Sequence, residues 1–557
     1  MDLQLDIFDR RDVHRGMKPP IVLVILLCFA TLARGDSLVF SNATVIDVER
    51  GVALPKMSVV VSGDCIVAVD AAAKVRVPAD AQTVDCSGKF LLPGLWDMHV
   101  HVLWEGADEF LPLCVANGIT GIRDMHTMMK LDQVRALRTK IESGQRVGPR
   151  FLYAGPIIDG PQPFWPESIS VKNADEARSA VRRLHGEGVD MIKVYEHLSR
   201  DAYFGIVAEC RALGLPFGGH VPQTVTSLEC ADAGQLTIEH LSDVLPHCSD
   251  QPGEADIAPP DPNPERSARV QRALGSAIQG SPDKTLWPPY ALGWFDYEAG
   301  RIWRQKMVAR GELLRVELLR EEARPAGERC LYRVHFSKEQ MLMTFDFDPE
   351  RKLTMASTNY VFNADKAAPV LERFRARNTW HCPTLTVHTT SYRDLDEALQ
   401  DPHRRYVSTG ILRKSKYEEM MAPPSSSGKK RFQQFLAVVK AMNDAGVGLL
   451  AGTDTPLGSI PGFGLHTELE LMVRAGLKPA EALRTATLNP ALCFHREKEF
   501  GTVATGKIAD LLVLDADPLQ DIRNTTHIWA VMTNGHFHDR AALDHLLAER
   551  EAAAKSR

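Results

Sequence analysis

Short apolar runs and helical stretches alternate through the middle of the chain. Residues 174–185 place apolar side chains at helical spacing, and Gly186 and Gly188 end that pattern. Runs typical of buried strands stand around such helices, at 116–124, 150–155, 191–195, 216–220 and 236–240. Repeated strand-helix units of roughly 20 to 30 residues predict a parallel sheet covered by helices. Their number favours an α/β fold based on a (β/α)8 TIM barrel over an open sheet.

Both ends of the chain have a different pattern, made of short β-rich runs. Residues 38–84 read as consecutive short strands, and the same pattern returns at 509–532, followed by a hairpin turn at Asn534-Gly535. We therefore predict one small β-sandwich domain built from both chain ends. The predicted domains are a composite β-sandwich at 36–90 plus 498–545 and a hydrolase barrel at 91–497.

A long stretch separates the strand that ends at His240 from the next candidate strand, at 380–388. One helix and one loop require far fewer residues, so we predict an insert at about 250–365. It opens rich in proline and aspartate, continues helical and charged over 302–320, and then resembles a hairpin around 346–351. Because it leaves the carboxyl end of a barrel strand, we expect it at the barrel mouth, either as a lid or as surface decoration.

Composition narrows the choice of partners. The 557 residues include 44% hydrophobic and 24% charged side chains, and the net charge is -6. This is an ordinary globular composition without a basic tract, so we expect neither nucleic acid nor an anionic membrane surface as partner. The ten cysteines are scattered singly. Without a Cys-x-x-Cys pair they do not form a metal knuckle, and most are expected to fill apolar core positions.

The first 35 residues have the pattern of an N-terminal extension followed by a secretory signal peptide. Lys18 gives a basic start, an apolar run follows over 21–32, and Ala33 and Gly35 supply small residues for cleavage. The run is short for a bilayer span. We therefore predict export to the periplasm or secretion, with no stable membrane association after cleavage. An uncleaved anchor is the alternative.

Polar side chains stand at the ends of the predicted strands. His99 and His101 end an apolar run, and side chains at i and i+2 share one face of a strand, so this pair can bind one metal ion. Each such residue alone is more simply explained as a strand cap or a snorkelling lysine. Six of them at the ends of five strands would instead meet at one barrel mouth, and their nitrogen atoms favour zinc or a similar ion. The set is His99, His101, Lys193, His220, His240 and Asp454.

Several motifs carry a family resemblance. They are Pro93-Gly94-Leu95-Trp96-Asp97-Met98-His99-Val100-His101, Gly219-His220-Val221-Pro222, Ile238-Glu239-His240-Leu241, Ala451-Gly452-Thr453-Asp454-Thr455-Pro456 and Gly506-Lys507-Ile508-Ala509-Asp510. Together they resemble the amidohydrolase superfamily, over roughly 38–240 and 365–540. The segment from Leu465 to Ala491 resembles the segment after the last barrel strand in the imidazolonepropionase-like and prolidase-like branch, which includes Xaa-Pro and Xaa-Arg dipeptidases.

The resemblance implies a binuclear metal centre with two divalent ions, expected to be zinc. His99 and His101 resemble the ligands of the more buried ion, and Asp454 would complete its shell. Lys193 would carry a carbamate derived from carbon dioxide and bridge both ions. The second ion would be held by His220 and His240. Such a centre activates water against a carbonyl carbon.

The resemblance also suggests catalytic and substrate-binding residues. Asp454 would take the proton of the attacking hydroxide and pass it to the leaving amine, and Tyr195 would donate to the carbonyl oxygen. Arg123 and His466 are the candidates to hold a substrate carboxylate. The loop at 156–166 departs from the family pattern, because it lacks the Gly-His of related dipeptidases. His126 could replace that contact or lie in a solvated loop.

Two classes of function follow. The first is a metal-dependent hydrolase that cleaves the amide bond of a short peptide or an N-acyl amino acid, with a cyclic amidase of the imidazolonepropionase type as the alternative. The second is a non-catalytic scaffold, since some proteins of this fold have lost their metals. Scaffolds lose ligands, and here all six are present, so we favour the enzyme. The expected partners are a small-molecule or short-peptide substrate and further copies of the same chain.

Overall fold

A computed structural model describes most of the chain. It covers residues 37–556 apart from 162, 251–257, 289–291, 293–294, 296–297, 325–326, 339, 349–351, 359, 392–398 and 416–425. The predicted signal peptide at 1–35 lies outside the described residues. Among the residues that are described, no helix has both the length and the apolar character needed to cross a membrane.

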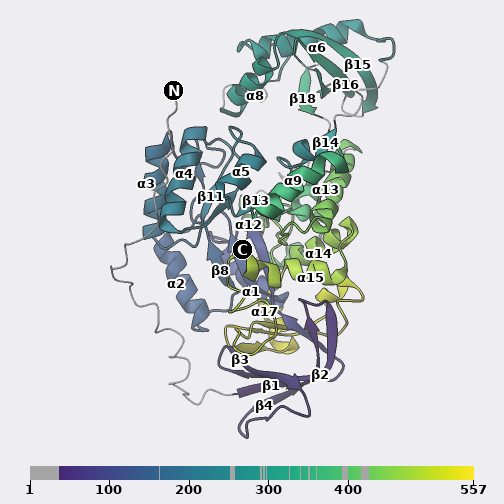
Figure 1. Cartoon of the computed structure of the whole chain (residues 1–557). Coiled ribbons are helices and arrows are strands. Elements are labelled where there is room, and N and C mark those ends of the chain that lie inside the picture. The colour runs from purple at the N-terminus through teal and green to yellow at the C-terminus, as the bar shows by residue number, and fades with distance from the viewer. Residues whose placement is uncertain are drawn as a thin grey trace, which may run out of the picture.

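Both ends of the chain contribute to one eight-stranded sheet, at the bottom of Figure 1. Its order is β23-β22-β21-β5-β1-β2-β3, and β4 pairs with β1. Antiparallel pairing of β5 with β21 joins the two ends, and a bridge from Cys65 to Ile508 brings the β3 edge back toward β21. A second packed layer is not assigned, so the β-sandwich stays a prediction. The strands are β1 (Ser37–Asp47), β2 (Val52–Ser62), β3 (Cys65–Ala71), β4 (Gln82–Asp85), β5 (Phe90–Pro93), β21 (Leu511–Leu514), β22 (Ile528–Thr533) and β23 (His536–His538).

Parallel strands form the centre of the molecule in two sheets. One has the order β6-β7-β8 and the other β10-β9-β11-β12-β13-β20. The strands are β6 (Leu95–Val100), β7 (Ile119–Asp124), β8 (Arg150–Tyr153), β9 (Ile158–Asp159), β10 (Ile169–Ser170), β11 (Ile192–Val194), β12 (Phe217–Gly219), β13 (Thr237–Glu239) and β20 (Trp380–Cys382). The fold is therefore mixed α/β, but the assigned sheets do not form one closed barrel.

The run 447–454 lies between these two sheets. Its apolar sequence is typical of a strand, but the structure has only isolated parallel bridges in or next to it, from His381 to Leu449 and from Val100 to Thr455. The amide of Met98 also donates to the carbonyl of Ala451 at 2.8 Å. Thus β6 and β20 both contact this run, although its hydrogen bonding is too irregular for a strand. The carboxyl ends of the central strands consequently lie near one another.

Helices surround the central strands, and the apolar faces of both pack into one large core. The helix α3, for example, buries Ala177, Val181 and Leu184, as the spacing predicts. Side chains at the helix starts accept hydrogen bonds from the free backbone N–H groups of the first turn, such as Asn173 for α3 and Ser199 for α4. The helices are α1 (Ala107–Ala116), α2 (Leu131–Glu142), α3 (Ala174–Gly186), α4 (Arg200–Leu213), α5 (Ser227–Ala233), α9 (Ala364–Ala376), α10 (Leu385–His388), α12 (Thr409–Lys414), α13 (Ser426–Asp444), α14 (Gly464–Ala475), α15 (Pro479–Thr485), α16 (Leu488–Cys493) and α17 (Arg540–Lys555).

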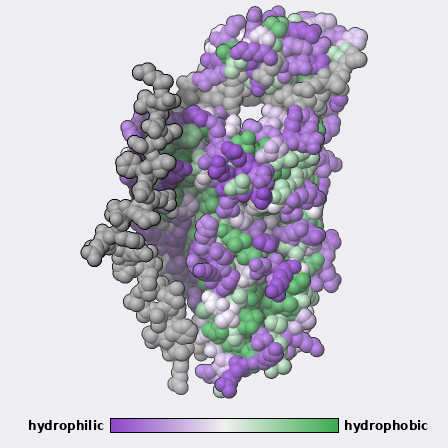
Figure 2. Space-filling view, viewed as in Figure 1, coloured by the Kyte–Doolittle hydropathy of each residue, from purple (hydrophilic) through white to green (hydrophobic). Residues whose placement is uncertain are grey.

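Residues 264–358 form a separate unit at the top of Figure 1. Two helices cover an antiparallel sheet of order β15-β16-β17-β18, and the unit has its own apolar core. A short pair of strands, β14 (Ser249–Asp250) and β19 (Val361–Phe362), joins it to the body. Figure 2 shows mostly hydrophilic side chains over this unit and more hydrophobic surface on the body below. The elements are α6 (Pro264–Ile278), α8 (Glu298–Ala309), β15 (Leu313–Arg324), β16 (Gly327–Phe336), β17 (Gln340–Phe347) and β18 (Leu353–Thr358).

The structure corrects two predicted elements. The helix expected over 302–320 ends at Ala309, because Gly311 adopts a φ of 97° and the chain then turns into β15. The strand expected over 380–388 stops at Cys382. Pro383 follows it, Thr384 has a φ of 49°, and α10 begins at the next residue. The turn of the hairpin expected at 346–351 lies partly outside the described residues.

Candidate metal centre

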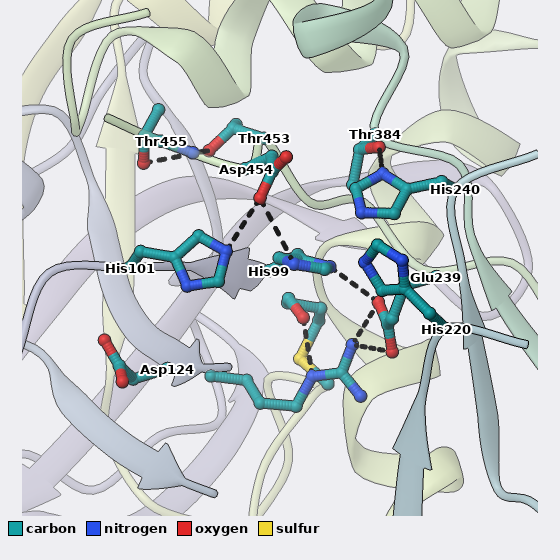
Figure 3. A network of polar contacts seen from close by, with 12 residues as sticks. His99, His101, Asp124, His220, Glu239, His240, Thr384, Thr453, Asp454 and Thr455 are labelled. Carbon is teal, nitrogen blue, oxygen red and sulfur yellow. Dashed lines mark hydrogen bonds and ion pairs between the residues drawn. The ribbon is translucent and has the colours of Figure 1, made fainter. Parts of the chain in front are cut away.

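The first ligand group lies at the carboxyl end of β6. His99 is fully buried on that strand, and His101 follows directly after it. Asp454 Oδ1 lies 2.8 Å from His101 Nε2 and 3.3 Å from His99 Nε2. One imidazole nitrogen from each histidine and one carboxylate oxygen therefore face a common point (Figure 3). This donor set suits a zinc-like ion.

Close backbone approach brings these three residues together. A Cβ atom at Gly452 would lie 2.8 Å from His99 Cβ and 2.4 Å from the sulfur of Cys382, so only glycine fits there. Asp97, also on β6, accepts hydrogen bonds from the backbone and hydroxyl of Thr453, at 3.0 and 2.7 Å. These contacts fix the backbone of Thr453, next to Asp454, against β6.

Glu239 orients His99 from the opposite side. His99 Nδ1 lies 2.7 Å from a Glu239 oxygen, and the Arg123 guanidinium donates to both oxygens of the same carboxylate at 2.9 Å. Burial opposes ionisation of Glu239, but Arg123 and Lys193 outweigh it and lower its pKa. Burial also holds the pKa of His99 well below its usual range. A neutral His99 that donates from Nδ1 presents its Nε2 lone pair toward Asp454.

Lys193 has an unusual environment for a charged side chain. Its side chain is 0% exposed on β11, and its Nζ has no hydrogen-bond partner among the described residues. Burial lowers the pKa of Lys193 to about 8, despite Glu239 and Asp454 nearby. Burial without a hydrogen-bond partner disfavours the charged form of this amine, so the neutral form is easier to reach than in an exposed lysine.

The second pair of histidines stands beside Lys193. His220 follows β12 and His240 follows β13, with ring centroids 4.7 Å apart, and His240 lies 5.0 Å from His99. His220 Nδ1 contacts Glu196 at 2.9 Å, and His240 Nδ1 contacts the Thr384 hydroxyl at 2.6 Å. In both rings Nδ1 is thus engaged, which leaves Nε2 as the available ligand atom. Figure 3 shows both rings beside His99.

Strained backbone accompanies these ligands. His240 has a φ of 64° and Asp454 a φ of 63°, in the left-handed region that non-glycine residues rarely adopt. Thr384, which contacts His240, has a φ of 49°. Strain of this kind is held by the surrounding fold and tends to gather at functional sites.

The remaining catalytic candidate, Tyr195, also lies at this centre. Its ring centroid is 4.1 Å from that of His220, and its hydroxyl oxygen accepts a hydrogen bond from the Trp165 indole at 3.1 Å. Burial raises the pKa of Tyr195 well above its usual range. The hydroxyl therefore stays protonated and can donate a hydrogen bond.

Arg123 and His466 are not placed to hold a substrate carboxylate, which corrects that expectation. Arg123 is 0% exposed, and its guanidinium is bonded to Glu239 and Thr237. The ring of His466 lies in α14, where its nitrogens contact the Thr525 hydroxyl and the carbonyl of Asn117. Both side chains therefore have structural roles, because their polar atoms form hydrogen bonds with buried neighbours.

A different arginine lies near the second pair of histidines. Arg431, on α13, donates to the hydroxyl of Ser242 at 3.3 Å, two residues beyond His240. Its guanidinium lies 5.4 Å from the ring of Phe435, which is packed on His388 at 4.4 Å. The ring of His388 in turn lies 5.9 Å from that of His240. Arg431 is thus a surface-accessible cation on the His240 side of the centre.

A cavity of about 210 Å3 opens beside His101. Its wall includes His126, which is 4% exposed and whose Nε2 has no partner among the described residues. Burial lowers the pKa of His126 to about 3, so the ring is neutral. None of the described residues within 264–358 lines this cavity. The lining residues are His101, Trp104, His126, Met128, Trp165, Pro166, Glu167, Lys414, Ser415, Pro456 and Leu457.

Sequence reasoning missed most of the residues that position the ligands. Glu239 lies in a quoted motif, and its place as a lone carboxylate in an apolar strand could have marked it. Glu196, three residues after Lys193, carried no such signal, and Thr384 is 144 residues from its partner His240. A second possible donor group, which adds Cys382 to His99 and Glu239, is less suitable. Burial raises the pKa of that thiol well above its usual range, and Arg123 already occupies the carboxylate.

Part of the chain matches a known protein family. Residues 402–537 match the profile of the amidohydrolase family. An adenine deaminase of Rubrobacter xylanophilus is 30% identical over 141 residues, which cover 24% of this chain and 23% of that protein. An imidazolonepropionase of a Geobacillus species is 37% identical over 87 residues, covering 14% and 20%. The chain thus spans only about a fifth of the length of these curated relatives.

Solved structures match over much more of the chain. A putative prolidase from Bifidobacterium longum has a TM-score of 0.56 at 21% identity, covering 92% of this chain and 99% of that one. A Xaa-Pro dipeptidase with bound methionine has a TM-score of 0.55 at 15% identity, covering 90% and 100%. Together, the family match, the imidazolonepropionase relatives and the prolidase-like structures support a member of the amidohydrolase superfamily. Within it, these matches support the imidazolonepropionase-like and prolidase-like branch.

Proposed function

We propose that this amidohydrolase is metal-dependent and cleaves the amide bond of a short peptide or an N-acyl amino acid. Four histidines and Asp454 lie close together (Figure 3), and the buried Nζ of Lys193 has no hydrogen-bond partner among the described residues; these observations support the proposal most. A stability role does not explain an unpaired buried amine. Metal ligation through a carbamate on Lys193 would explain this buried amine, because a carbamate supplies oxygen ligands and negative charge.

The ligand residues fit two divalent ions, for which zinc is the first candidate. His99, His101 and Asp454 would hold one ion, and His220 and His240 the other, with Lys193 between them. Divalent ions bound here would lower the pKa of a water molecule and polarise the scissile carbonyl. Glu239, Thr384 and Glu196 fix the donor faces of three of these rings.

The chain's own residues supply the proton transfers. Asp454 lies between His99 and His101, and its pKa is lowered because both histidines and Lys193 outweigh the effect of burial. It is therefore ionised and can accept a proton from the attacking water, then donate it to the leaving nitrogen. The protonated hydroxyl of Tyr195 would donate to the carbonyl oxygen as negative charge develops on it.

Arg431 takes over the role first assigned to Arg123 and His466. Its guanidinium lies on the His240 side of the centre. Desolvation lowers the pKa of Arg431, and the neighbours Asp243 and Tyr360 oppose that shift. A free carboxylate on the leaving amino acid would form a charge-assisted hydrogen bond with it. The carboxylate would hold the leaving side of the substrate at His240.

A screen of the full chain, loaded with zinc and bicarbonate, tests the proposal. Dipeptides and N-acyl amino acids should be hydrolysed, and amidation of their C-terminus should raise KM more than it lowers kcat. The Arg431→Gln variant should show the same rise in KM with free acids and little further change with amides. As a matched control, Arg413→Gln removes a cation from α12. Equal turnover of free and amidated substrates would contradict the role of Arg431.

Lactams belong in the same screen, because several of the curated relatives are imidazolonepropionases. Hydrolysis of cyclic amides alone would favour a cyclic amidase. Lack of hydrolysis across all three substrate classes, with metal bound, would contradict the enzyme and favour a scaffold.

We also propose the barrel and the β-sandwich that the sequence predicts. The contacts of the run 447–454 with β6 and β20 support a (β/α)8 barrel, and the return of β3 toward β21 supports a β-sandwich. Export through the segment 1–35 remains a proposal that N-terminal sequencing from the native host tests. A mature start near Asp36 is expected, and an intact N-terminus on soluble protein would contradict it.

A further inference from the structure

We propose that the cavity beside His101 binds the acyl group of the substrate and selects an apolar group about the size of one aromatic ring. This inference rests on the proposed amide hydrolysis and names the substrate class for it. The cavity is not explained by metal binding, because only His101 of the six ligand candidates lines it.

The wall of the cavity is apolar and aromatic. Trp104 and Trp165 supply two indole rings, and Met128, Pro456 and Leu457 supply aliphatic surface. Apolar walls favour apolar groups, and indole faces favour flat rings in particular. The charged lining residues are Glu167 and Lys414. Lys414 is ion-paired with Glu105, which lies outside the wall, so its charge is already compensated.

The size of the cavity sets the size of the group. Its volume of about 210 Å3 is below the roughly 300 Å3 at which pockets for drug-sized ligands begin. An apolar cavity of about 150 Å3 in another protein holds a benzene molecule. This cavity therefore has room for a phenyl or indole ring, or a branched aliphatic chain, and leaves an acetyl group largely without contacts.

Two hydrogen bonds connect the cavity wall to the reacting centre. The Trp104 indole donates to the carbonyl of His101 at 3.1 Å, and the Trp165 indole donates to the hydroxyl of Tyr195 at 3.1 Å. A group bound between these rings thus lies next to a metal-ligand candidate and next to the proposed donor to the carbonyl oxygen. The carbonyl attached to that group would be placed at the centre.

The position of the cavity also assigns it to the acyl side of the substrate. Arg431 contacts Ser242, two residues beyond His240, whereas the cavity opens beside His101, and Asp454 contacts His101 directly. A substrate that extends from Arg431 across the centre would put its carboxylate at one end and its acyl group in the cavity. His126 offers one hydrogen-bonding nitrogen there, since its Nε2 is otherwise unused among the described residues.

The test is a series of acyl-glycines with one leaving group. The zinc-loaded full chain is assayed with acetyl-, butanoyl-, hexanoyl-, phenylacetyl- and indole-3-acetyl-glycine. Burial of one ring-sized apolar group favours phenylacetyl-glycine over acetyl-glycine by about 10- to 100-fold in kcat/KM. A second series keeps the phenylacetyl group and changes the leaving amino acid from glycine to leucine. The values of kcat/KM in this second series should differ much less than those in the acyl series.

Variants connect the preference to this cavity. Met128, which is 42% exposed, can be replaced without cavity formation in the core. Met128→Lys places a charge in the apolar wall and should reduce the phenylacetyl-to-acetyl ratio at least about tenfold. Val67→Lys is the matched control, because Val67 is 46% exposed on β3 and is not among the lining residues of the cavity. Its ratio should equal that of the parent protein.

A binding measurement separates this inference from the proposed reaction. Calorimetric titration with benzyl alcohol should show saturable binding that Met128→Lys weakens and Val67→Lys does not, whereas ethanol should not bind. A flat acyl series with active enzyme would overturn the cavity assignment and leave the amide hydrolysis intact. If no acyl-glycine is cleaved, the proposed function fails, and the benzyl alcohol titration still decides whether the cavity accepts a ring.

Discussion

The contact between Glu239 and His99 offers the sharpest prediction about the site. Glu239 is 2% exposed, and its carboxylate contacts His99 at 2.7 Å, Arg123 at 2.9 Å and the Thr237 hydroxyl at 2.5 Å. Glu239→Gln keeps the shape of the side chain, removes its charge and replaces one acceptor oxygen by a donor. The buried guanidinium of Arg123 then loses its counter-charge.

Two effects of Glu239→Gln can be estimated from this geometry. Removal of one partner from a buried ion pair destabilises a protein by about 3–5 kcal/mol, because the remaining charge stays buried. Loss of the carboxylate that orients a metal-binding histidine typically costs about 10- to 100-fold in metal affinity. We therefore expect a large decrease in the free energy of unfolding together with weaker binding of the more buried ion.

Glu196→Gln is the matched control. Glu196 contacts His220 Nδ1 at 2.9 Å, but its side chain is 35% exposed, so no buried cation is left behind. We expect this variant to weaken the second ion with at most about 1 kcal/mol loss of stability. Urea unfolding of the metal-free proteins and competition with a chelator measure both quantities. A Glu239→Gln protein as stable as the parent, with equal zinc affinity, would refute the reasoning.

Three further outcomes are expected. Asp454→Asn should lose at least about a hundredfold in kcat with a smaller change in KM, measured by steady-state kinetics; unchanged kcat would exclude it as the base. Thr384→Val should weaken metal binding about tenfold, because His240 Nδ1 loses its partner at 2.6 Å; chelator competition shows whether it does. Burial raises the pKa of Glu468 to about 7 from 4.5. The contribution of protonated Glu468 to the free energy of unfolding is fully present below pH 4.5. It is lost as the pH rises through 7 and amounts to at most about 3 kcal/mol. Unfolding from pH 4.5 to 8 should be less pH-dependent in Glu468→Gln, and an equal slope in both proteins would contradict the assignment.

The site residues that could be predicted from the sequence are those at the ends of regular strands. His99 and His101 share a face because they are two residues apart, and Lys193, His220 and His240 stand at the ends of β11, β12 and β13. Parallel strands separated by helices put these ends side by side. The local sequence pattern is therefore sufficient to predict that these residues meet. The alternation of apolar runs and helices predicts this part of the fold for the same reason.

Other features depend on contacts between distant segments, which local pattern does not encode. Arg123 follows the same strand-end rule as the ligands, yet Glu239, 116 residues away, binds it inside the core. Thr384 and Arg431 reach the site from segments after the insert. The irregular run 447–454 contacts its neighbours through a few bridges rather than a ladder, so its apolar sequence overpredicts a strand.

Metal content of the full chain tests the central claim most directly. Protein purified with zinc and bicarbonate, and then Lys193→Ala prepared in the same way, would be compared by elemental analysis. The geometry around Lys193 predicts close to two ions per chain in the parent and a clear loss in the variant. A stoichiometry of about one ion that Lys193→Ala leaves unchanged would contradict the binuclear centre.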